Sequence, residues 1–381
     1  MLRRCARRVQ GKGAAVSKAA DCGRCVAPEA ADAAPPKATV VVAVYNIERY
    51  VGACLESVCA QTERDIEILA VDDGSTDGSG AIVAAAAARD GRIRVLAKEN
   101  GGLSSARNAG IEAARGTVVL FVDGDDLLEP QAVERVLAAF SAHDPDVVTF
   151  GARCFPKGAA ASWTVECLSP VAGAYEAGDL DVLYRYDTKP YVWRSAFSRR
   201  LLQGCDLRFD ESLWFGEDML FYFEAYPQSR RTVVVEDKLY VYRVARTGSL
   251  MDASAADLAL KVDKHLDIVE RIVASWRWRG WLEGRGARLL DWALEFLSRD
   301  LFACENDDMN RLAARLGQVL GPCLADGSAE GIDPASRQLL ERLASGRPLG
   351  PLAAKAVLWR YYRHRMGWRF CLDKLRGAYD A

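Results

Sequence analysis

Strand-like and helical segments alternate regularly between residues 38 and 122, and this alternation restricts the fold more than any other feature. The strand-like runs lie at residues 40–44, 66–71, 92–97 and 118–122. The helical patterns lie between them, at residues 48–61, 77–89 and 103–115. Continuous apolar runs are typical of strands covered on both faces, and the alternation is typical of parallel sheets. The sequence therefore predicts an α/β fold with a Rossmann-like, mostly parallel sheet and flanking helices.

The chain changes character on either side of this region. Residues 1–37 are basic and Ala-rich without a periodic apolar face, which predicts a disordered tail. After residue 130 we expect a helix near 131–142 and strands at 146–150 and 232–242. Beyond about residue 252, Leu, Val and Trp recur every three or four residues, which predicts helices. We therefore expect three regions, a basic tail, an α/β domain and a helical C-terminal region, at residues 1–37, 38–250 and 251–381.

The composition excludes several classes of function. Lys plus Arg number 50 and Asp plus Glu number 52, so the chain lacks the basic surplus of a nucleic-acid-binding protein. Only three His residues are present, which argues against catalysis that relies on several histidines. An odd number of Cys, 11, without disulfide-like spacing favours a reducing cytoplasm. No apolar run is long enough for a signal peptide or a membrane span, so we expect a cytoplasmic protein.

Two acidic clusters follow predicted strands. Asp72 and Asp73 follow the second strand, and Asp123, Asp125 and Asp126 follow the fourth. The carboxyl ends of parallel strands meet at one edge of a sheet, where ligands bind. A single Asp there is ordinarily a turn residue or a helix cap, but two clusters of carboxylates repel unless a cation lies between them. With no His or Cys nearby, that cation is expected to be Mg²⁺ or Mn²⁺, which bridges carboxylates to the phosphates of a nucleotide.

Other phosphate-binding motifs are missing. The sequence has no GxxxxGK[ST] motif and no GxGxxG after the first strand, which excludes a P-loop and a dinucleotide-binding site.

Four segments, in order and spacing, closely resemble family 2 glycosyltransferases of the bacterial cell-surface polysaccharide type: residues 40–62, 66–79, 99–116 and 118–130. The resemblance continues more loosely through residues 192–202, 216–226 and 240–250. It implies a GT-A fold that binds a nucleotide-sugar, usually a UDP-sugar.

The resemblance also implies roles for residues of the donor site. Asp73 matches the position that hydrogen-bonds the base, and a carboxylate can accept from the imide N–H of uracil. Tyr45 would lie against that base, although a core aromatic is an equally good interpretation. Asp123 and Asp125 match the DxD motif, with Asp123 directed to the ribose and Asp125 holding Mn²⁺ or Mg²⁺. Asp126 is either a helper or the cap of the following turn.

Three arginines are candidates for contact with the donor. Arg107 could reach the base or the diphosphate, or it could form a salt bridge to the acidic cluster. Arg243 and Arg246 fall in a segment that closes over the site in relatives, and an Arg can bind a diphosphate through two parallel hydrogen bonds. Relatives place a His in this part of the chain and this sequence does not, so we expect water to complete the metal shell.

A pair of acids at 217 and 218 is the candidate for acid–base chemistry. In the family, the Asp of the matching pair is the base that takes the proton of the acceptor hydroxyl, which implies this role for Asp218. Glu217 would be its neighbour or would position the acceptor. Two acids at a predicted helix N-terminus are also favoured by the helix dipole, and both interpretations can hold together. One displacement with such a base inverts the anomeric carbon.

Three functions fit these features. The leading hypothesis is transfer of a sugar to a glycan or glycolipid acceptor in polysaccharide biosynthesis. A polymerase would usually show a second catalytic module or membrane spans. A non-catalytic nucleotide-sugar-binding or scaffold protein need not keep its acids, so the joint presence of Asp73, Asp123, Asp125 and Asp218 argues against it.

The last 31 residues combine basic and aromatic side chains. Residues 351–381 contain seven Lys or Arg residues, with Trp, Tyr and Phe interleaved. A basic helix with an aromatic face can lie on an anionic membrane, which would bring the enzyme to a lipid-linked glycan at the inner face of the cell membrane. Alternatively, the aromatic residues pack on the catalytic domain and the Arg residues are solvated.

Overall fold

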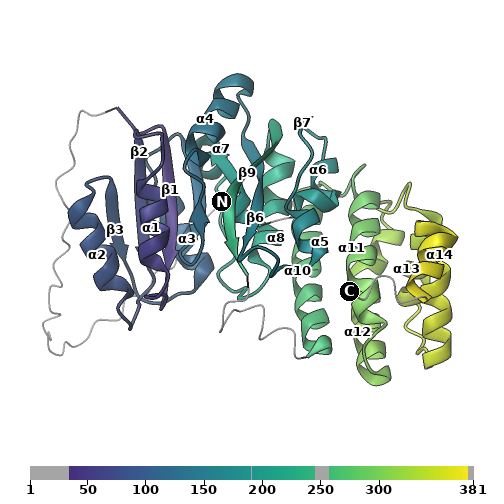
Figure 1. Cartoon of the computed structure of the whole chain (residues 1–381). Coiled ribbons are helices and arrows are strands. Elements are labelled where there is room, and N and C mark those ends of the chain that lie inside the picture. The colour runs from purple at the N-terminus through teal and green to yellow at the C-terminus, as the bar shows by residue number, and fades with distance from the viewer. Residues whose placement is uncertain (1–33, 190, 245–256, 376–381) are drawn as a thin grey trace, which may run out of the picture. The chain divides into compact units, whose positions relative to one another are not determined.

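The computed structural model describes residues 34–189, 191–244 and 257–375, and the described residues from Pro35 onward form one compact unit. The four predicted strands are present as β1 (Ala38–Val44), β2 (Ile66–Asp72), β3 (Ile93–Ala97) and β4 (Val118–Asp123) (Figure 1). The helices between them are α1 (Val51–Cys59), α2 (Ser79–Arg89) and α3 (Leu103–Ala113). The predicted α/β fold is confirmed.

Within the described residues, the strands form one nine-stranded sheet in the order β3-β2-β1-β4-β8-β6-β9-β5, with β7 paired to β9. The later strands are β5 (Leu127–Leu128), β6 (Val147–Phe155), β7 (Gly173–Glu176), β8 (Ser195–Ser198) and β9 (Arg231–Arg243). Strands β1 to β4 pair in parallel, as predicted. Strand β8 runs antiparallel to both β4 and β6, so the sheet is mixed beyond β4. A four-residue strand has too little pattern for its direction to be predicted.

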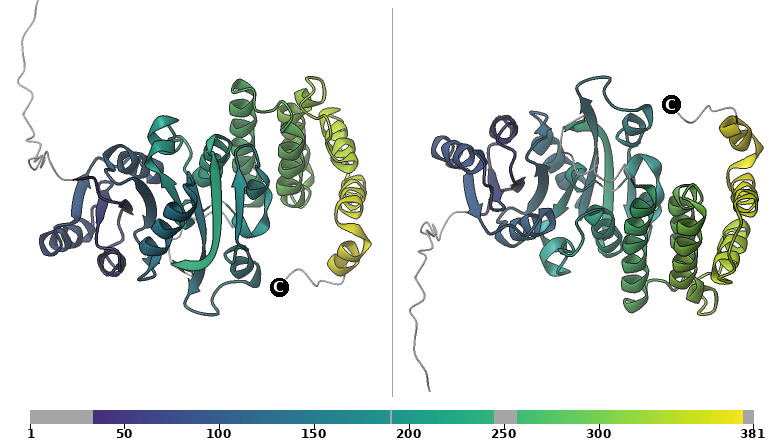
Figure 2. Two further views of the ribbon diagram at one scale, coloured as in Figure 1. Left: turned by 90° about the horizontal axis from the view of Figure 1, so that it is seen from above. Right: turned by 90° about the horizontal axis from the view of Figure 1, so that it is seen from below.

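Alternate side chains of β1 enter two different hydrophobic cores, one on each face of the sheet. Val40 and Val42 pack with the apolar side chains of α1 and α2. Val41 and Ala43 pack in the core that contains the buried side chains of α3. Successive side chains of a strand point to opposite faces, so a strand covered on both sides is mostly apolar, and the buried Thr39 of β1 donates to the buried Glu67 of β2 at 2.8 Å. Figure 2 shows the helices around this part of the sheet from above and below.

Further helices in the middle of the chain are α4 (Ala132–His143), α5 (Ser162–Cys167), α6 (Asp181–Tyr184), α7 (Arg199–Gly204) and α8 (Glu217–Ala225). The C-terminal region is helical, as predicted, with α10 (Leu258–Trp278), α11 (Gly286–Leu301), α12 (Asn306–Leu320), α13 (Pro334–Ala344) and α14 (Pro351–Leu375). The boundary predicted at residue 250 and nearly all of the predicted tail lie outside the described residues.

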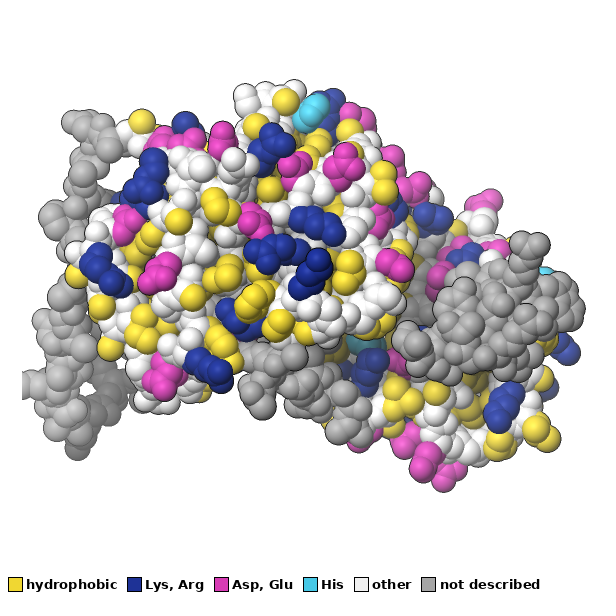
Figure 3. All heavy atoms as spheres, viewed as in Figure 1, with side chains coloured by type: hydrophobic (Ala, Val, Ile, Leu, Met, Phe, Trp, Pro, Cys, Tyr) yellow, Lys and Arg dark blue, Asp and Glu magenta, His cyan; other side chains and the backbone are white. Residues whose placement is uncertain are grey.

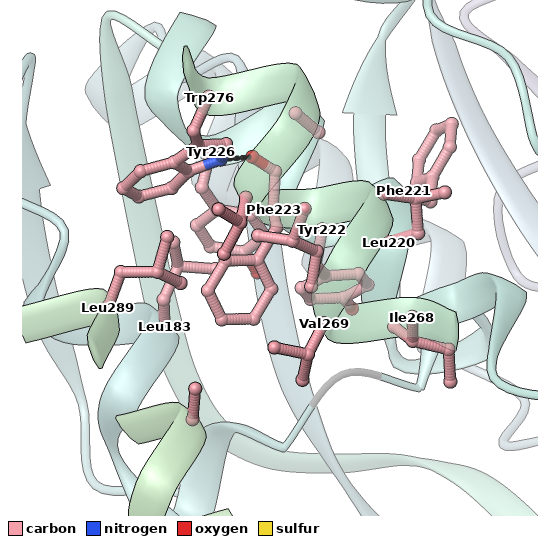
Figure 4. Packing of buried hydrophobic residues seen from close by; sticks show 14 of the residues in the cluster. Leu183, Leu220, Phe221, Tyr222, Phe223, Tyr226, Ile268, Val269, Trp276 and Leu289 are labelled. Carbon is pink, nitrogen blue, oxygen red and sulfur yellow. Dashed lines mark hydrogen bonds between the residues drawn. The ribbon is translucent and has the colours of Figure 1, made fainter. Parts of the chain in front are cut away.

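The C-terminal helices share a core with the sheet. Buried side chains of α10 to α13 belong to the same hydrophobic cluster as those of α3 and α8. Figure 4 shows the contact between α8 and α10, where the buried Trp276 ring lies beside Phe223. The Trp276 Nε1–H donates to the Phe223 carbonyl at 2.8 Å, which satisfies the polar atom of this large buried ring. The second half of α8 therefore packs directly against α10.

Helix α14 shows how some of the C-terminal aromatic residues pack. Tyr361 and Tyr362 are buried in the helical core, and Trp359 packs against it. The Tyr362 hydroxyl lies 3.4 Å from Ser298 Oγ of α11, so these rings are packed, but against the C-terminal helices and not against the α/β domain as the alternative from the sequence had it. Peripheral membrane contact through residues 351–381 stays a prediction. No helix among the described residues is both long enough and apolar enough to cross a membrane.

The charged side chains of the surface are mixed in sign. On the face drawn in Figure 3, acidic and basic side chains are interspersed, with hydrophobic ones between them. The formal net charge of the chain is -2.

The turn that begins α8 lies in close contact with α10 at Gly216. Its φ is 72°, in the left-handed region that favours glycine. A Cβ added there would lie 2.2 Å from Ile268 Cδ1 on α10. Glycine is therefore required both by the backbone conformation and by the neighbouring helix.

We expect Gly216→Ala to lower the free energy of unfolding by about 2–4 kcal/mol, from about 1 kcal/mol of left-handed strain and about 1–3 kcal/mol of overpacking. Gly280→Ala is the matched control, because Gly280 has the same φ of 72° and nothing within 4 Å of the added Cβ. Urea unfolding of both variants measures the difference. Equal losses would show that contact with Ile268 contributes nothing.

Candidate active site

The acidic clusters lie at neighbouring strand ends, as the parallel topology predicts. In the register of the sheet, Val44 of β1 pairs with Asp72 of β2, and Ala43 pairs with Asp123 of β4. The carboxyl ends of β2 and β4 therefore flank the end of β1 at one edge of the sheet.

Asp73 follows β2 and is almost completely buried, with 2% of its surface exposed. Its Oδ1 accepts hydrogen bonds from Lys98 Nζ at 2.6 Å and from the Gly101 N–H at 3.1 Å. Its Oδ2 accepts from the Gly102 N–H at 2.7 Å. Asp73 thus holds the loop that leads into α3, and its contact with a nucleotide base stays a prediction.

Arg107 of α3 joins three carboxylates from two other elements. Its side chain is 2% exposed, and its Nη1 donates to Glu217 Oε1 at 2.9 Å and to Asp218 Oδ1 at 2.7 Å. Its Nη2 donates to Asp123 Oδ1 at 2.8 Å. Of the two roles considered from the sequence, the structure contains the salt bridge to the acidic cluster. These three ion pairs hold the end of β4 and the first turn of α8 close together.

The environment of Asp218 favours the protonated form of its carboxyl group. The pKa of Asp218 is raised to about 7, because burial and the Glu217 and Asp123 carboxylates together outweigh the lowering effect of Arg107. The second oxygen, Oδ2, accepts from the Val192 N–H at 3.0 Å. A carboxyl group whose pKa lies near neutrality can take up a proton during a reaction at physiological pH.

The turn after β4 requires a glycine and encloses one of its acids. A Cβ on Gly124 would lie 2.6 Å from the Ala43 carbonyl oxygen and 2.4 Å from Ile47 Cδ1. Asp126 is 2% exposed, and its oxygens accept from the Tyr240 hydroxyl at 2.8 Å and the Arg243 N–H at 2.6 Å. Burial raises the pKa of Asp126 well above its usual range. Asp126 therefore binds β9 through both of its carboxylate oxygens.

The remaining predicted donor residues occupy different places. Tyr45 is 47% exposed, which excludes the alternative of a core aromatic. Arg243 lies at the turn of the acidic cluster, where its Nε donates to the Asp125 carbonyl at 2.7 Å. Its guanidinium also lies over the Tyr50 ring, 5.1 Å from the centroid. Arg246 lies outside the described residues.

The acids of the turn form an incomplete metal site by themselves. Among the described residues, no group of three or more His, Cys, Asp or Glu side chains could hold a metal ion. Mg²⁺ and Mn²⁺ commonly bind through one or two carboxylates while substrate phosphates and water supply the other oxygens. The chemistry of Asp123 and Asp125 fits such a site, and metal dependence stays a prediction.

Two supports of the site were not identified from the sequence. Tyr240 is buried and binds Asp126, and it also accepts from the Asp123 N–H at 3.2 Å. The Val192 N–H binds Asp218 from a short helical turn, η2 (Val192–Arg194). A backbone donor leaves no signal in the sequence, whereas a Tyr within an apolar strand is an indication of a buried hydroxyl that needs a partner.

The sequence is similar to those of known glycosyltransferases. The sequence model for glycosyl transferase family 2 matches residues 39–200. The succinoglycan biosynthesis protein ExoO of Rhizobium meliloti is 32% identical over 310 residues, which cover 74% of this chain and 87% of that protein. The chain belongs to glycosyl transferase family 2. The uncharacterized glycosyltransferase EpsJ of Bacillus subtilis is 37% identical, over 55% of this chain and 61% of EpsJ.

The extent of these matches differs between relatives. The chain spans 61% of the length of EpsJ and of the putative glycosyltransferase EpsH of Bacillus subtilis. Among solved structures, Staphylococcus aureus TarS 1–349 in complex with UDP-GlcNAc has a TM-score of 0.67. It is 21% identical, and the match covers 87% of this chain and 92% of that one, which supports the same fold.

We expect Arg107→Met to lower the free energy of unfolding by about 3–5 kcal/mol, because three carboxylates lose their shared cation. The loss should be smaller at pH 5 than at pH 8. A carboxyl group whose pKa is higher in the folded state than in the unfolded state stabilises the folded protein at low pH. For Asp218 the pKa in the folded state is about 7, so this stabilisation is lost as the pH rises through about 7.

Urea unfolding of this variant at both pH values measures the loss. Arg311→Met is the control, since it removes ion pairs of an exposed arginine to Asp308 and Asp263 and should change stability by under about 1 kcal/mol. A large loss that is the same at pH 5 and pH 8 would contradict the electrostatic origin.

Proposed function

We propose that this protein is an inverting glycosyltransferase that moves a sugar from a UDP-sugar to a hydroxyl group of a glycan or glycolipid acceptor in polysaccharide biosynthesis. The observation that carries the proposal is the Arg107 ion-pair network. It unites the acid at the end of β4, expected to contact the donor, with the acids of α8, expected to act on the acceptor.

The donor site is proposed at the edge formed by β1, β2 and β4. Asp73 would accept from the base, Tyr45 would lie against it, and Asp123 would contact the ribose. The position of Arg243 beside the Asp125 carbonyl supports a role in binding the diphosphate. A structure of TarS, a protein of the same fold, contains UDP-GlcNAc, which supports UDP as the nucleotide. Arg246 stays a candidate for the same role.

A divalent cation is proposed as a cofactor, with Asp125 as its protein ligand. Mn²⁺ or Mg²⁺ bound there would supply positive charge beside the leaving nucleoside diphosphate. The chain itself places the carboxylates at a turn, where Gly124 permits close approach to β1. Hard oxygen ligands fit these two ions better than zinc, and the one thiol beside the turn among the described residues, that of Cys54, is fully buried and donates to the Asp123 carbonyl at 3.8 Å.

Asp218 is proposed as the general base. Its raised pKa suits a group that must release a proton before each turnover and accept one during it. Arg107 and the Val192 N–H fix the two carboxylate oxygens in place, and Glu217 lies beside them on the same guanidinium. A single base without a second carboxylate as nucleophile gives inversion of configuration.

The acceptor is proposed to be a glycan or a lipid-linked glycan. ExoO, which shares most of its length with this chain, is named for the biosynthesis of a polysaccharide, succinoglycan. The basic C-terminal residues 351–381 would favour contact with an anionic membrane that carries such an acceptor. Co-sedimentation with anionic vesicles of the full chain and of a chain ending at Gly350 measures this contribution.

We expect EDTA to abolish hydrolysis and transfer of the donor sugar, and excess Mn²⁺ to restore them. Asp125→Ala should abolish turnover even with excess Mn²⁺, because the carboxylate that holds the ion is gone. Release of UDP from UDP-sugars, followed by mass spectrometry, measures both effects. Full activity of the parent protein in EDTA would contradict the proposed cofactor.

We expect Asp218→Asn to reduce transfer by roughly 10²–10⁴-fold while donor binding is retained, because the amide keeps the shape but cannot accept the proton. The transfer rate of the parent should rise with pH through about 7, as Asp218 loses its proton. Calorimetry with UDP and a pH profile of transfer measure these two effects.

Two further variants, one contrasting and one control, complete the test of Asp218 as the base. Asp73→Ala should show the opposite pattern, with weakened donor binding first. Asp206→Asn is a control, since its side chain is 86% exposed and outside the site, and it should behave as the parent. Loss of UDP binding in Asp218→Asn would place that residue in the donor site instead. Donor binding without hydrolysis or transfer in the parent would favour the non-catalytic alternative.

A further inference from the structure

A lysine and two exposed aromatic rings form a cluster in the connection between β6 and β8. Trp163 of α5 is 47% exposed, and Tyr186 of the short helical turn η1 (Tyr186–Thr188) is 48% exposed. The Tyr186 hydroxyl donates to the Trp163 carbonyl at 3.2 Å, which joins the two segments. Lys189 Nζ lies 4.5 Å from the centroid of the Tyr186 ring and 5.4 Å from that of Trp163.

The lysine has no carboxylate partner among the described residues. Nearby Asp187 is occupied, because it accepts from Arg185 Nε at 2.9 Å and from the Val171 N–H at 2.8 Å. Glu166 interacts with Tyr186 but forms no ion pair with Lys189 within the described part of the chain. Burial lowers the pKa of Lys189, with only Cys167 acting in the opposite direction.

A partly desolvated ammonium group over two rings is suited to an external anion. It has three donors, and an ammonium group without hydrogen-bond acceptors is unfavourable away from water. The two rings provide flat apolar surface beside it, of the kind that packs against the C–H face of a sugar. Two more apolar side chains of the same connection are exposed, Val165 and Val171.

The cluster lies close in the chain to the proposed base. Lys189 precedes Val192 by three residues, and the Val192 N–H binds Asp218 Oδ2. Three residues span at most about 10 Å of extended chain, so the backbone of Lys189 lies within that distance of the backbone beside the base. Tyr191 stacks on Trp193, with centroids 5.2 Å apart. The segment that carries the cluster therefore leads directly into the backbone that holds the proposed base.

We propose that Lys189, Trp163 and Tyr186 form an acceptor subsite that binds a sugar carrying an anionic group, either a carboxylate or a phosphate. The inference rests on the proposed function and adds the chemical class of the acceptor. The ammonium group of Lys189 binds the anion, and the Trp163 and Tyr186 rings pack against the sugar.

The test measures binding of three probes to the full chain by calorimetry and saturation-transfer NMR. The probes are oligogalacturonate, a neutral malto-oligosaccharide of equal length, and glycerol phosphate. We expect an anionic probe to bind more tightly than the neutral one, and the tighter of the two anionic probes identifies the anion.

Lys189→Met should weaken binding of that anionic probe at least tenfold, whereas Lys189→Arg should retain it. Trp163→Ala should weaken oligogalacturonate and leave glycerol phosphate unchanged.

Lys157→Met is the matched control, because Lys157 is an exposed lysine of the same connection. An equal loss in this variant, no loss in Lys189→Met, or no binding of an anionic probe would overturn the subsite. UDP binding is measured on the same samples and should be unchanged in all variants. If the parent binds UDP but no anionic probe, the subsite alone fails; if it binds no UDP or UDP-sugar, the proposed function fails.

Discussion

The ion pairs of one buried guanidinium determine the arrangement of the whole candidate site. Arg107 reaches Asp123 on β4 and both acids of α8, residues that lie 16, 110 and 111 positions away in the chain. A buried cation requires partners, and three partly buried carboxylates beside one another are stabilised by a shared cation. Because one positive charge faces three acidic groups, the cluster retains excess negative charge. This excess, together with burial, raises the pKa of Asp218 towards neutrality.

The same network explains why the C-terminal helices matter to a site that they do not line. The acids at 217 and 218 begin α8, and the residue before them, Gly216, lies against Ile268 of α10. Further along α8, the Phe223 carbonyl accepts from Trp276 of α10. The position of the proposed base thus depends on packing against the C-terminal region, and stability of that region and geometry of the site are linked through α8.

Local pattern was sufficient for much of the fold but not for its long-range pairings. Strands β1 to β4 and their helices follow from apolar runs and helical spacing, because each is encoded within a few residues. The antiparallel direction of β8 depends on how the chain returns from a connection of about 40 residues with only short elements, which no local pattern records. The acids that follow β2 and β4 were predicted from their position at strand ends, whereas Glu217 and Asp218 were predicted from the family resemblance. The inward role of Asp126 was missed, because its partners Tyr240 and Arg243 lie more than 100 residues away.

Arg107 itself left a signal in the sequence that local analysis can use. On α3, the positions Leu103, Arg107, Gly110 and Ile111 follow the spacing of one helical face, and all but the arginine are apolar or small. A charged side chain at a core position of an amphipathic helix is rare unless it is paired. Such a residue therefore predicts buried carboxylates on a neighbouring element. Because α3 packs against the strands that end in acids, those carboxylates had to include one at the edge of the sheet. The position of Arg107 on the core face of α3 thus relates the sequence pattern of that helix to the carboxylates of the site.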